Sequence, residues 1–292
     1  MKKNAFLILI TCFRTLVPKD SSQPQGRAPL TAHDPADQSP LTGALINPAT
    51  DPEPVRVINA ETPSPLLLVC EHAGRKVPQS LDNLGLSLAA FETHIACDLG
   101  ASEVAQGLAA RFSCRLVMQN YSRLTIDCNR RPGEPSSIPE VSDGVVIPAN
   151  QGLDGAQKKR REEEIFRPYA TRCKAETERA CTEFAYSIHS FTPQMRDGAP
   201  RPWDIAFLYR SPDSDGARLA DLCAELWPDL VIGRNEPYFI DEKTDWFIPV
   251  CAEPRGVLHC LIEIRNDHLS DAAGRDLWTN RLYHLLDRFM EP

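Results

Sequence analysis

Short apolar runs that alternate with amphipathic stretches constrain the fold of this chain more than any other feature. The runs at residues 66–70, 186–189 and 257–264 are bounded by loop residues, a pattern typical of interior strands in a sheet covered on both faces. The stretches at residues 100–112 and 271–290 place apolar residues at helical spacing. This alternation predicts an α/β fold in which helices flank a largely parallel sheet.

The remaining segments extend the same alternation along the chain. Further predicted elements are helices at 86–95, 158–184 and 215–226 and strands at 115–118, 124–127, 203–209 and 230–232. Residues 132–155 are rich in Gly and Pro, and loops of this length in compact domains often cover a binding site. The pattern favours one domain over residues 56–292.

The first 55 residues are set apart by their composition. Met1-Lys2-Lys3 and the apolar residues 5–10 resemble the start of a signal peptide, but no small-x-small cleavage site follows. An export signal and a wrongly assigned start both stay open. Residues 19–54 are rich in Pro, Ser, Gln and Asp and carry too little apolar surface to fold alone. We therefore expect a disordered leader over residues 1–55.

Charge and cysteine usage narrow the class of protein. The chain has 32 Lys and Arg against 40 Asp and Glu, a net charge of −8, which disfavours general binding to nucleic acid or anionic membranes. No run approaches the roughly 18–20 apolar residues that span a bilayer. Cys70, Cys128 and Cys260 lie in apolar runs, and the ten cysteines form no Cys-x-x-Cys pair. Buried, reduced thiols and a cytoplasmic location are expected.

Residues suited to metal-assisted chemistry stand where three apolar runs end. His72 follows the first run, His189 ends the second, and Glu263 lies inside the third. Ligands of open α/β sheets bind beyond the carboxyl ends of the strands, so these side chains could form a metal-dependent hydrolase site. Burial would raise the pKa of Glu263, as suits a general base. A structural pair of Glu263 with Arg265 is the alternative.

Asp98 offers a carboxylate for the same site. It stands four residues after His94, so the two side chains would share a face if this segment is helical. One interpretation is a hydrogen bond on a helix surface. The other makes Asp98 a metal ligand, or a carboxylate that orients a ligating histidine.

Residues 123–130 alternate between polar and apolar side chains, and the strand prediction places Asp127 and Asn129 on one face. A half-buried aspartate needs a partner, which Arg123 or Arg130 would supply. The sequence leaves open a structural ion pair and a guanidinium clamp for a substrate carboxylate. Asn235 lies in a turn-rich loop that either lines a pocket or only turns the chain.

Seven segments taken together resemble the N-formylglutamate amidohydrolase family. They occur in family order within residues 62–290 and are, in sequence, 70–74, 94–101, 122–130, 188–193, 201–205, 235–238 and 262–267. The resemblance implies a three-layer α/β/α sandwich with a mixed, mostly parallel sheet, similar to zinc carboxypeptidases. It also implies hydrolysis of the N-formyl amide of N-formylglutamate or a related N-formyl amino acid, with release of formate.

The resemblance assigns roles to individual residues. It implies one Zn²⁺ held by His72 and His189, with Glu263 as the base. The His-x-x-Glu ligand pair of the carboxypeptidases is absent, which leaves Asp98 or Glu71 as third ligand, with Asp98 favoured. Bound substrate would meet a further set of polar side chains: Arg130 and Asn129 at its α-carboxylate, Arg123 or Arg265 at a side-chain carboxylate, and Asn235.

Two other functions compete with deformylation. The first is a zinc amidase that acts on another N-acyl amino acid or a small peptide. The second is a non-catalytic relative that binds small carboxylates. In each case the expected partner is a small molecule, neither nucleic acid nor membrane, and the oligomeric state is left open.

Overall fold

The computed structural model describes residues 43–291. Most of the predicted leader, including the signal-like segment, lies outside the described residues. Residues 43–54, however, pack against the domain, so composition was misleading for this stretch. Leu45 is buried, and the backbone amides of Leu45 and Ile46 donate to the Glu164 carboxylate at 3.0 and 2.9 Å. The Tyr121 hydroxyl donates to the carbonyl of Pro52 at 2.6 Å.

Nine strands and five α-helices make up the regular structure of the described part of the chain. The strands are β1 Val55–Ile58, β2 Leu66–Cys70, β3 Arg115–Gln119, β4 Val141–Ser142, β5 Val145–Val146, β6 Phe184–Phe191, β7 Ile205–Leu208, β8 Ile232–Arg234 and β9 Leu258–Arg265. The helices are α1 Ala101–Phe112, α2 Gly155–Arg161, α3 Arg167–Thr177, α4 Asp215–Leu226 and α5 Ala272–Met290.

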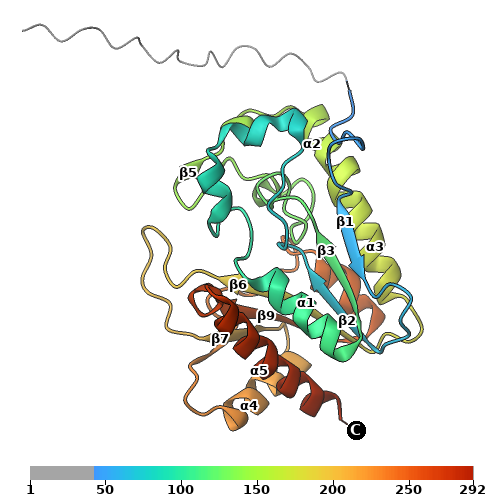
Figure 1. The fold of residues 1–292 in the computed structure, drawn as a ribbon, viewed down its shortest axis with the longest axis vertical. Coiled ribbons are helices and arrows are strands. Elements are labelled where there is room, and N and C mark those ends of the chain that lie inside the picture. The colour runs from blue at the N-terminus through green and yellow to red at the C-terminus, as the bar shows by residue number, and fades with distance from the viewer. Residues whose placement is uncertain (1–42, 292) are drawn as a thin grey trace, which may run out of the picture. The chain divides into compact units, whose positions relative to one another are not determined.

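Seven strands form one mixed sheet in the order β1-β3-β2-β6-β9-β7-β8 (Figure 1). The central strands β3, β2, β6 and β9 are parallel to one another. Strand β1 is antiparallel to β3, and β7 is antiparallel to β9 while β8 runs parallel to β7. The predicted mixed, mostly parallel sheet is therefore confirmed, and its inner strands end together at one edge.

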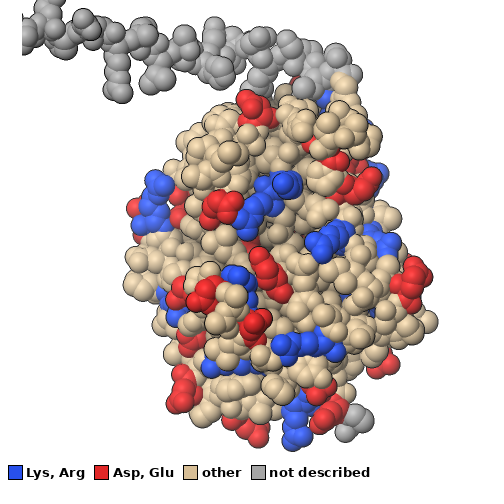
Figure 2. All heavy atoms as spheres, in the orientation of Figure 1, with Lys and Arg blue, Asp and Glu red and all other residues tan. Residues whose placement is uncertain are grey.

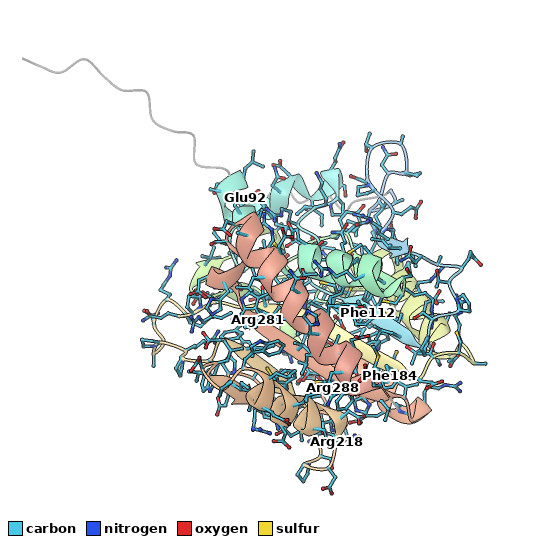
Figure 3. All side chains as sticks on the ribbon, turned by 60° about the horizontal axis from the view of Figure 1, so that its bottom comes forward. Glu92, Phe112, Phe184, Arg218, Arg281 and Arg288 are labelled. Carbon is cyan, nitrogen blue, oxygen red and sulfur yellow. The ribbon has the colours of Figure 1, made fainter. Side chains whose placement is uncertain are left out.

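Helices cover both faces of this sheet and make a three-layer α/β/α sandwich. One face carries Leu68, Ile188 and Ile262 and packs against α1, α4 and α5. In Figure 3, α5 crosses this face with α1 and α4 on either side of it. The opposite face carries Val69 and Leu261 and packs against α3 and neighbouring helical turns. Strand residues are apolar on both faces because both faces are buried.

Three predicted elements were wrong in type or length. The strand predicted at 124–127 is not formed: residues 123–125 are a turn, in which the amide of Thr125 donates to the carbonyl of Ser122 at 2.8 Å, so local partners replace a strand ladder. The predicted helix 86–95 is a 3₁₀ helix, Leu88–Glu92, that ends in extended backbone at Thr93. The helical stretch predicted to reach 184 ends with α3 at Thr177 and is interrupted by a π-helical turn at Glu162–Phe166.

The surface carries its charges in a mixed arrangement. Lys and Arg side chains alternate with Asp and Glu side chains over the face seen in Figure 2. The acidic excess is therefore not gathered into one large patch on that face. Within residues 43–291, no helix is both long enough and apolar enough to cross a membrane.

Candidate active site

Three side chains from different parts of the chain converge at the carboxyl edge of the sheet. His72 lies two residues beyond β2, His189 lies near the end of β6, and Asp98 precedes α1. The amide of Asp98 donates to the carbonyl of His72 at 3.0 Å, and the amide of Ser190 donates to Asp98 Oδ2 at 3.2 Å. The parallel pairing of β2 and β6 brings the two histidines to the same edge.

The nitrogens and oxygen of this group face one another at short range. Asp98 Oδ2 lies 2.8 Å from His189 Nδ1 and 3.4 Å from His72 Nδ1. One ligand atom from each of the three residues lies within 4.8 Å of the other two, and all three residues are buried. Two imidazoles and a carboxylate in this arrangement are a donor set that zinc prefers.

The other nitrogen of each imidazole is held by a second carboxylate. His72 Nε2 lies 2.7 Å from Asp127 Oδ1, and His189 Nε2 lies 3.0 Å from Glu71 Oε2. The Ser187 hydroxyl also donates to Glu71 Oε2 at 2.6 Å. A carboxylate on the far nitrogen fixes the ring and leaves the near nitrogen free to bind a metal. Asp98 lines the cavity described below whereas Glu71 lies behind His189, which favours Asp98 as third ligand.

Charges in this cluster favour a positive group between the carboxylates. Although burial opposes the imidazolium, Glu71 and Asp98 raise the pKa of His189 well above its usual range. Burial likewise favours a neutral carboxyl at Asp98, but His72 and His189 hold its pKa well below the usual range. The same field that stabilises a proton here would stabilise a divalent cation.

Some buried side-chain atoms of the described residues make no hydrogen bond. Of the nine such atoms among residues 43–291, His72 Nδ1, Glu71 Oε1 and Glu263 Oε2 belong to this cluster. Buried polar atoms are rarely left unpaired, because each costs the free energy of desolvation. The unpartnered nitrogen of His72 belongs to the donor set of His72, Asp98 and His189. The residues present therefore fit a metal ion.

Glu263 joins this group through the register of the sheet. The pairing of β6 with β9 sets His189 directly beside Glu263, so both side chains project from the same face. Burial, helped by the charge of Asp98 and opposed by His189, raises the pKa of Glu263 to about 7. A buried carboxylate with such a pKa can accept and release a proton near neutral pH.

A cavity of about 370 Å³ opens over these residues. His72, Asp98, His189 and Glu263 line its inner part, and loop residues from three chain segments line its outer part. Its volume is in the range of pockets for small molecules.

Three of the predicted substrate-binding residues line this cavity, namely Arg123, Asn129 and Arg130. Arg123 is the partner of Asp127, with Nη2 at 2.7 Å from Oδ2, and its Nη1 lies 3.4 Å from Asp98 Oδ1. Arg130 instead binds Asp245 through Nη1 at 2.7 Å. The Asn129 side-chain oxygen accepts from the Phe247 amide at 3.2 Å.

The other two predicted substrate residues lie outside the cavity lining. Arg265 neither pairs with Glu263 nor lines the cavity. Its Nε donates to Asp267 at 2.8 Å, and its Nη2 lies 3.3 Å from Asp204. It is the last residue of β9, where the chain turns away and strand alternation no longer sets side-chain direction. The Asn235 side chain accepts from the Tyr209 amide at 2.8 Å, a bond that ties its loop to the end of β7.

His94 does not face Asp98, because no helix continues between them. Its Nε2 lies 3.0 Å from Asp143 Oδ2, in the loop that follows β4. Asp98 therefore reaches the site by its position before α1.

The turn-rich loop that carries Asn235 does line the cavity, but through Tyr238 and Phe239, to which the sequence assigned no role. Arg201 donates to the Tyr238 hydroxyl at 3.0 Å, and its guanidinium carbon lies 4.9 Å from the centre of the Tyr238 ring. The available signal was the family-like segment 235–238, which contains Tyr238 and ends just before Phe239.

Comparisons with known proteins identify the family of this chain. The family model for N-formylglutamate amidohydrolase matches residues 64–270. A crystal structure of a gene product from Agrobacterium tumefaciens superposes with a TM-score of 0.76 at 34% identity, covering 84% of this chain and 98% of that one. N-formylglutamate amidohydrolase from Ralstonia eutropha JMP134 superposes with a TM-score of 0.61 at 19% identity, covering 81% and 96%. No curated protein matches the sequence.

The sandwich fold, the buried site at the carboxyl edge of the sheet and these matches define a hydrolase that acts on amide bonds. More narrowly, the chain belongs to the N-formylglutamate amidohydrolase family.

Proposed function

We propose that this protein is a metal-dependent hydrolase that removes the formyl group from N-formyl amino acids and releases formate. The observation that carries the proposal is the convergence of His72 Nδ1, His189 Nδ1 and Asp98 Oδ2 beside Glu263. His72 Nδ1 makes no hydrogen bond among the described residues. The family match supports the formyl amide as the bond cleaved.

The three donors would hold a single Zn²⁺. When bound, such an ion acts as a Lewis acid on a carbonyl oxygen and lowers the pKa of water to about 7. Asp127 and Glu71 hold the two imidazoles from behind, so that the Nδ1 atoms face the cavity.

Glu263 is the proposed general base. Its carboxylate accepts a proton from water as the oxygen attacks the formyl carbon, and it then delivers this proton to the leaving amine nitrogen. The pKa of about 7 that burial gives to this side chain suits both directions of transfer. Cleavage of the C–N bond leaves formate and a free amino acid.

Arg130 is the proposed partner of the substrate's α-carboxylate. Its Nη1 is held by Asp245, which orients the guanidinium, and Nη2 and Nε remain for a bidentate pair. Asn129 lines the same wall of the cavity. Arg123 is placed near the acyl oxygen, because it already contacts Asp98 and Asp127.

Metal content and formate release together test the proposal. We expect the purified protein to bind about one zinc ion per chain, to lose formate release on chelation, and to regain it when zinc is restored. His189→Ala should bind zinc poorly and release no formate. Full activity after complete removal of metal, or stoichiometric zinc without any release of formate, would contradict the proposal.

A further inference from the structure

The cavity over the candidate active site has two chemically different halves. Its inner half is polar and carries the histidines and carboxylates described above. Its outer half presents large apolar side chains to solvent: Phe239 is 69% exposed, Val141 is 54% exposed and Tyr238 is 38% exposed. These residues belong to segments about a hundred positions apart, yet they line one cavity. Large side chains exposed together at the mouth of a cavity mark a surface that a ligand covers.

The loops that carry this apolar rim are fixed by specific contacts. Asp143, in the turn after β4, accepts the amide of Arg196 at 3.0 Å. Tyr238 is held by Arg201, which also donates to the carbonyl of Thr192 at 3.2 Å. The rim is defined here as Val141, Tyr238 and Phe239, and these contacts anchor the two segments that carry it.

Charge at the cavity limits how many carboxylates a substrate can carry. Arg123 and Arg130 are the arginines among the described lining residues. Arg123 directs both terminal nitrogens at Asp127 and Asp98, whereas Arg130 uses only Nη1 for Asp245 and Thr244. One guanidinium fork is thus left for one carboxylate.

The rim contributes no positive side chain to the described cavity lining for a second negative charge. Glu140 lines the cavity next to Val141 and is exposed, so a side-chain carboxylate reaching outward would meet a like charge. Arg201 stacks on Tyr238 and lies outside the cavity lining. Apolar area beside the Glu140 carboxylate favours an uncharged, apolar group.

We infer that the rim is a side-chain subsite, and that the substrates are N-formyl amino acids with apolar, uncharged side chains that pack on Phe239 and Val141. This inference rests on the proposed deformylase function and narrows its substrate class. The α-carboxylate lies on Arg130, the formyl group lies at Glu263, and the side chain points outward to the rim. Covering an apolar side chain of leucine or phenylalanine size is worth roughly a 10- to 100-fold gain in kcat/KM.

The test compares formate release from the zinc-loaded enzyme across N-formyl derivatives of leucine, phenylalanine, glycine, glutamine and glutamate. We expect kcat/KM for the leucine and phenylalanine derivatives to exceed that for glycine and glutamate by roughly 10-fold or more. Glutamine matches glutamate in size without its charge, so it should lie above glutamate.

Substitutions at the rim separate a subsite from a general effect. Phe239→Ser should lower kcat/KM for the leucine and phenylalanine derivatives by roughly 10-fold and leave the glycine derivative unchanged. Leu88→Ser is the matched control, because Leu88 is 73% exposed and lies outside the cavity lining; it should change none of these values.

The possible failures are distinguishable. A preference for glutamate over leucine, or an equal loss on glycine and leucine in Phe239→Ser, overturns the apolar subsite and leaves deformylation intact. Release of formate from none of the five compounds overturns the proposed function, and the subsite with it.

Discussion

Two buried clusters of charged side chains sit at opposite ends of the parallel strands. The active-site cluster of His72, Asp98, His189 and Glu263 lies beyond the carboxyl ends. The basal ion cluster lies at the other end, where Arg115 begins β3. There, Nη1 of Arg115 donates to the carbonyl and to Oε2 of Glu176. Its Nη2 donates to the Ser64 carbonyl and to Thr182 Oγ1.

The difference between the clusters is what their charges are paired with. In the basal ion cluster, Glu176 also receives Arg172 at 2.8 Å and Arg179 at 3.3 Å, so its negative charge is matched by protein groups. In the active-site cluster, carboxylates crowd around two imidazoles. Unpartnered atoms do not separate the two clusters, because Arg115 Nε and Arg172 Nε are also buried without a hydrogen-bond partner among residues 43–291. The separation lies in the charges: three arginines offset Glu176 and stabilise the fold, whereas the crowded carboxylates at the histidines attract a cation.

The largest expected effect separates activity from stability at Glu263. We expect Glu263→Gln to lower kcat for formate release by roughly 10²- to 10⁴-fold, because the amide cannot accept a proton. Its midpoint of urea unfolding should stay equal or rise, since a neutral amide is easier to bury than a carboxylate. A variant that kept activity within a few-fold of wild type with zinc bound would remove Glu263 from the mechanism.

In the basal ion cluster we expect the opposite result, a loss of stability with kcat unchanged. Glu176→Ala should lower the free energy of unfolding by roughly 3–5 kcal/mol, because it leaves the buried Arg115 without its carboxylate. The kcat of the folded fraction should match that of wild type. The control is Glu178→Ala, an exposed glutamate two residues further along. A large loss of kcat in folded Glu176→Ala would show that the two clusters are coupled.

A smaller effect, on zinc affinity, is expected at Glu71, which holds His189 Nε2. Glu71→Gln should weaken zinc binding by roughly 10- to 100-fold, because the carboxylate that orients His189 becomes a neutral amide. Asp245→Asn is the matched comparison, since Asp245 contacts Arg130 rather than a histidine, and it should leave zinc affinity unchanged. Competition with a chromogenic chelator measures the zinc affinity of the two variants and of wild type. Equal affinities in these three proteins would argue against a role for Glu71.

The smallest expected effect is the pH dependence of stability in the basal ion cluster. Burial alone would raise the pKa of Glu176, but the hydrogen bond from Arg115 and the charge of Arg172 outweigh it and lower this pKa below its usual value. A depressed pKa contributes stability above the unfolded value and loses it as pH falls through the folded value. The stability gap between wild type and Glu176→Ala should therefore shrink from about pH 5 to about pH 3. A gap that stayed constant would contradict this assignment.

The layout of the fold and the meeting of His72, His189 and Glu263 could be predicted from sequence for one reason. Apolar runs identify parallel strands, and the carboxyl ends of parallel strands meet at one edge. Asp98 reached the same site by another route than the expected helix face, because the 3₁₀ helix ends at Thr93.

The contacts of the segments around the sheet could not be predicted in the same way. Strand alternation gave Arg265 and Glu263 the same direction, but Arg265 ends β9 and turns to Asp204 and Asp267. The composition of residues 43–54 predicted disorder, yet this stretch packs on the domain. The Glu164 carboxylate, far along the chain, accepts the backbone amides of Leu45 and Ile46. Loop conformation and contacts of this range depend on tertiary packing, which spacing in the sequence does not encode.

The pairing of His189 with Glu263 across neighbouring strands has a consequence for how such an enzyme diversifies. The distance between the proposed base and the proposed zinc ligand is set by a backbone ladder, which insertions or exchanges in the surrounding loops leave in place. Mutations around Val141 and Phe239 can therefore retune which molecules are accepted while the reaction itself is preserved, which makes those loops the natural target for directed evolution.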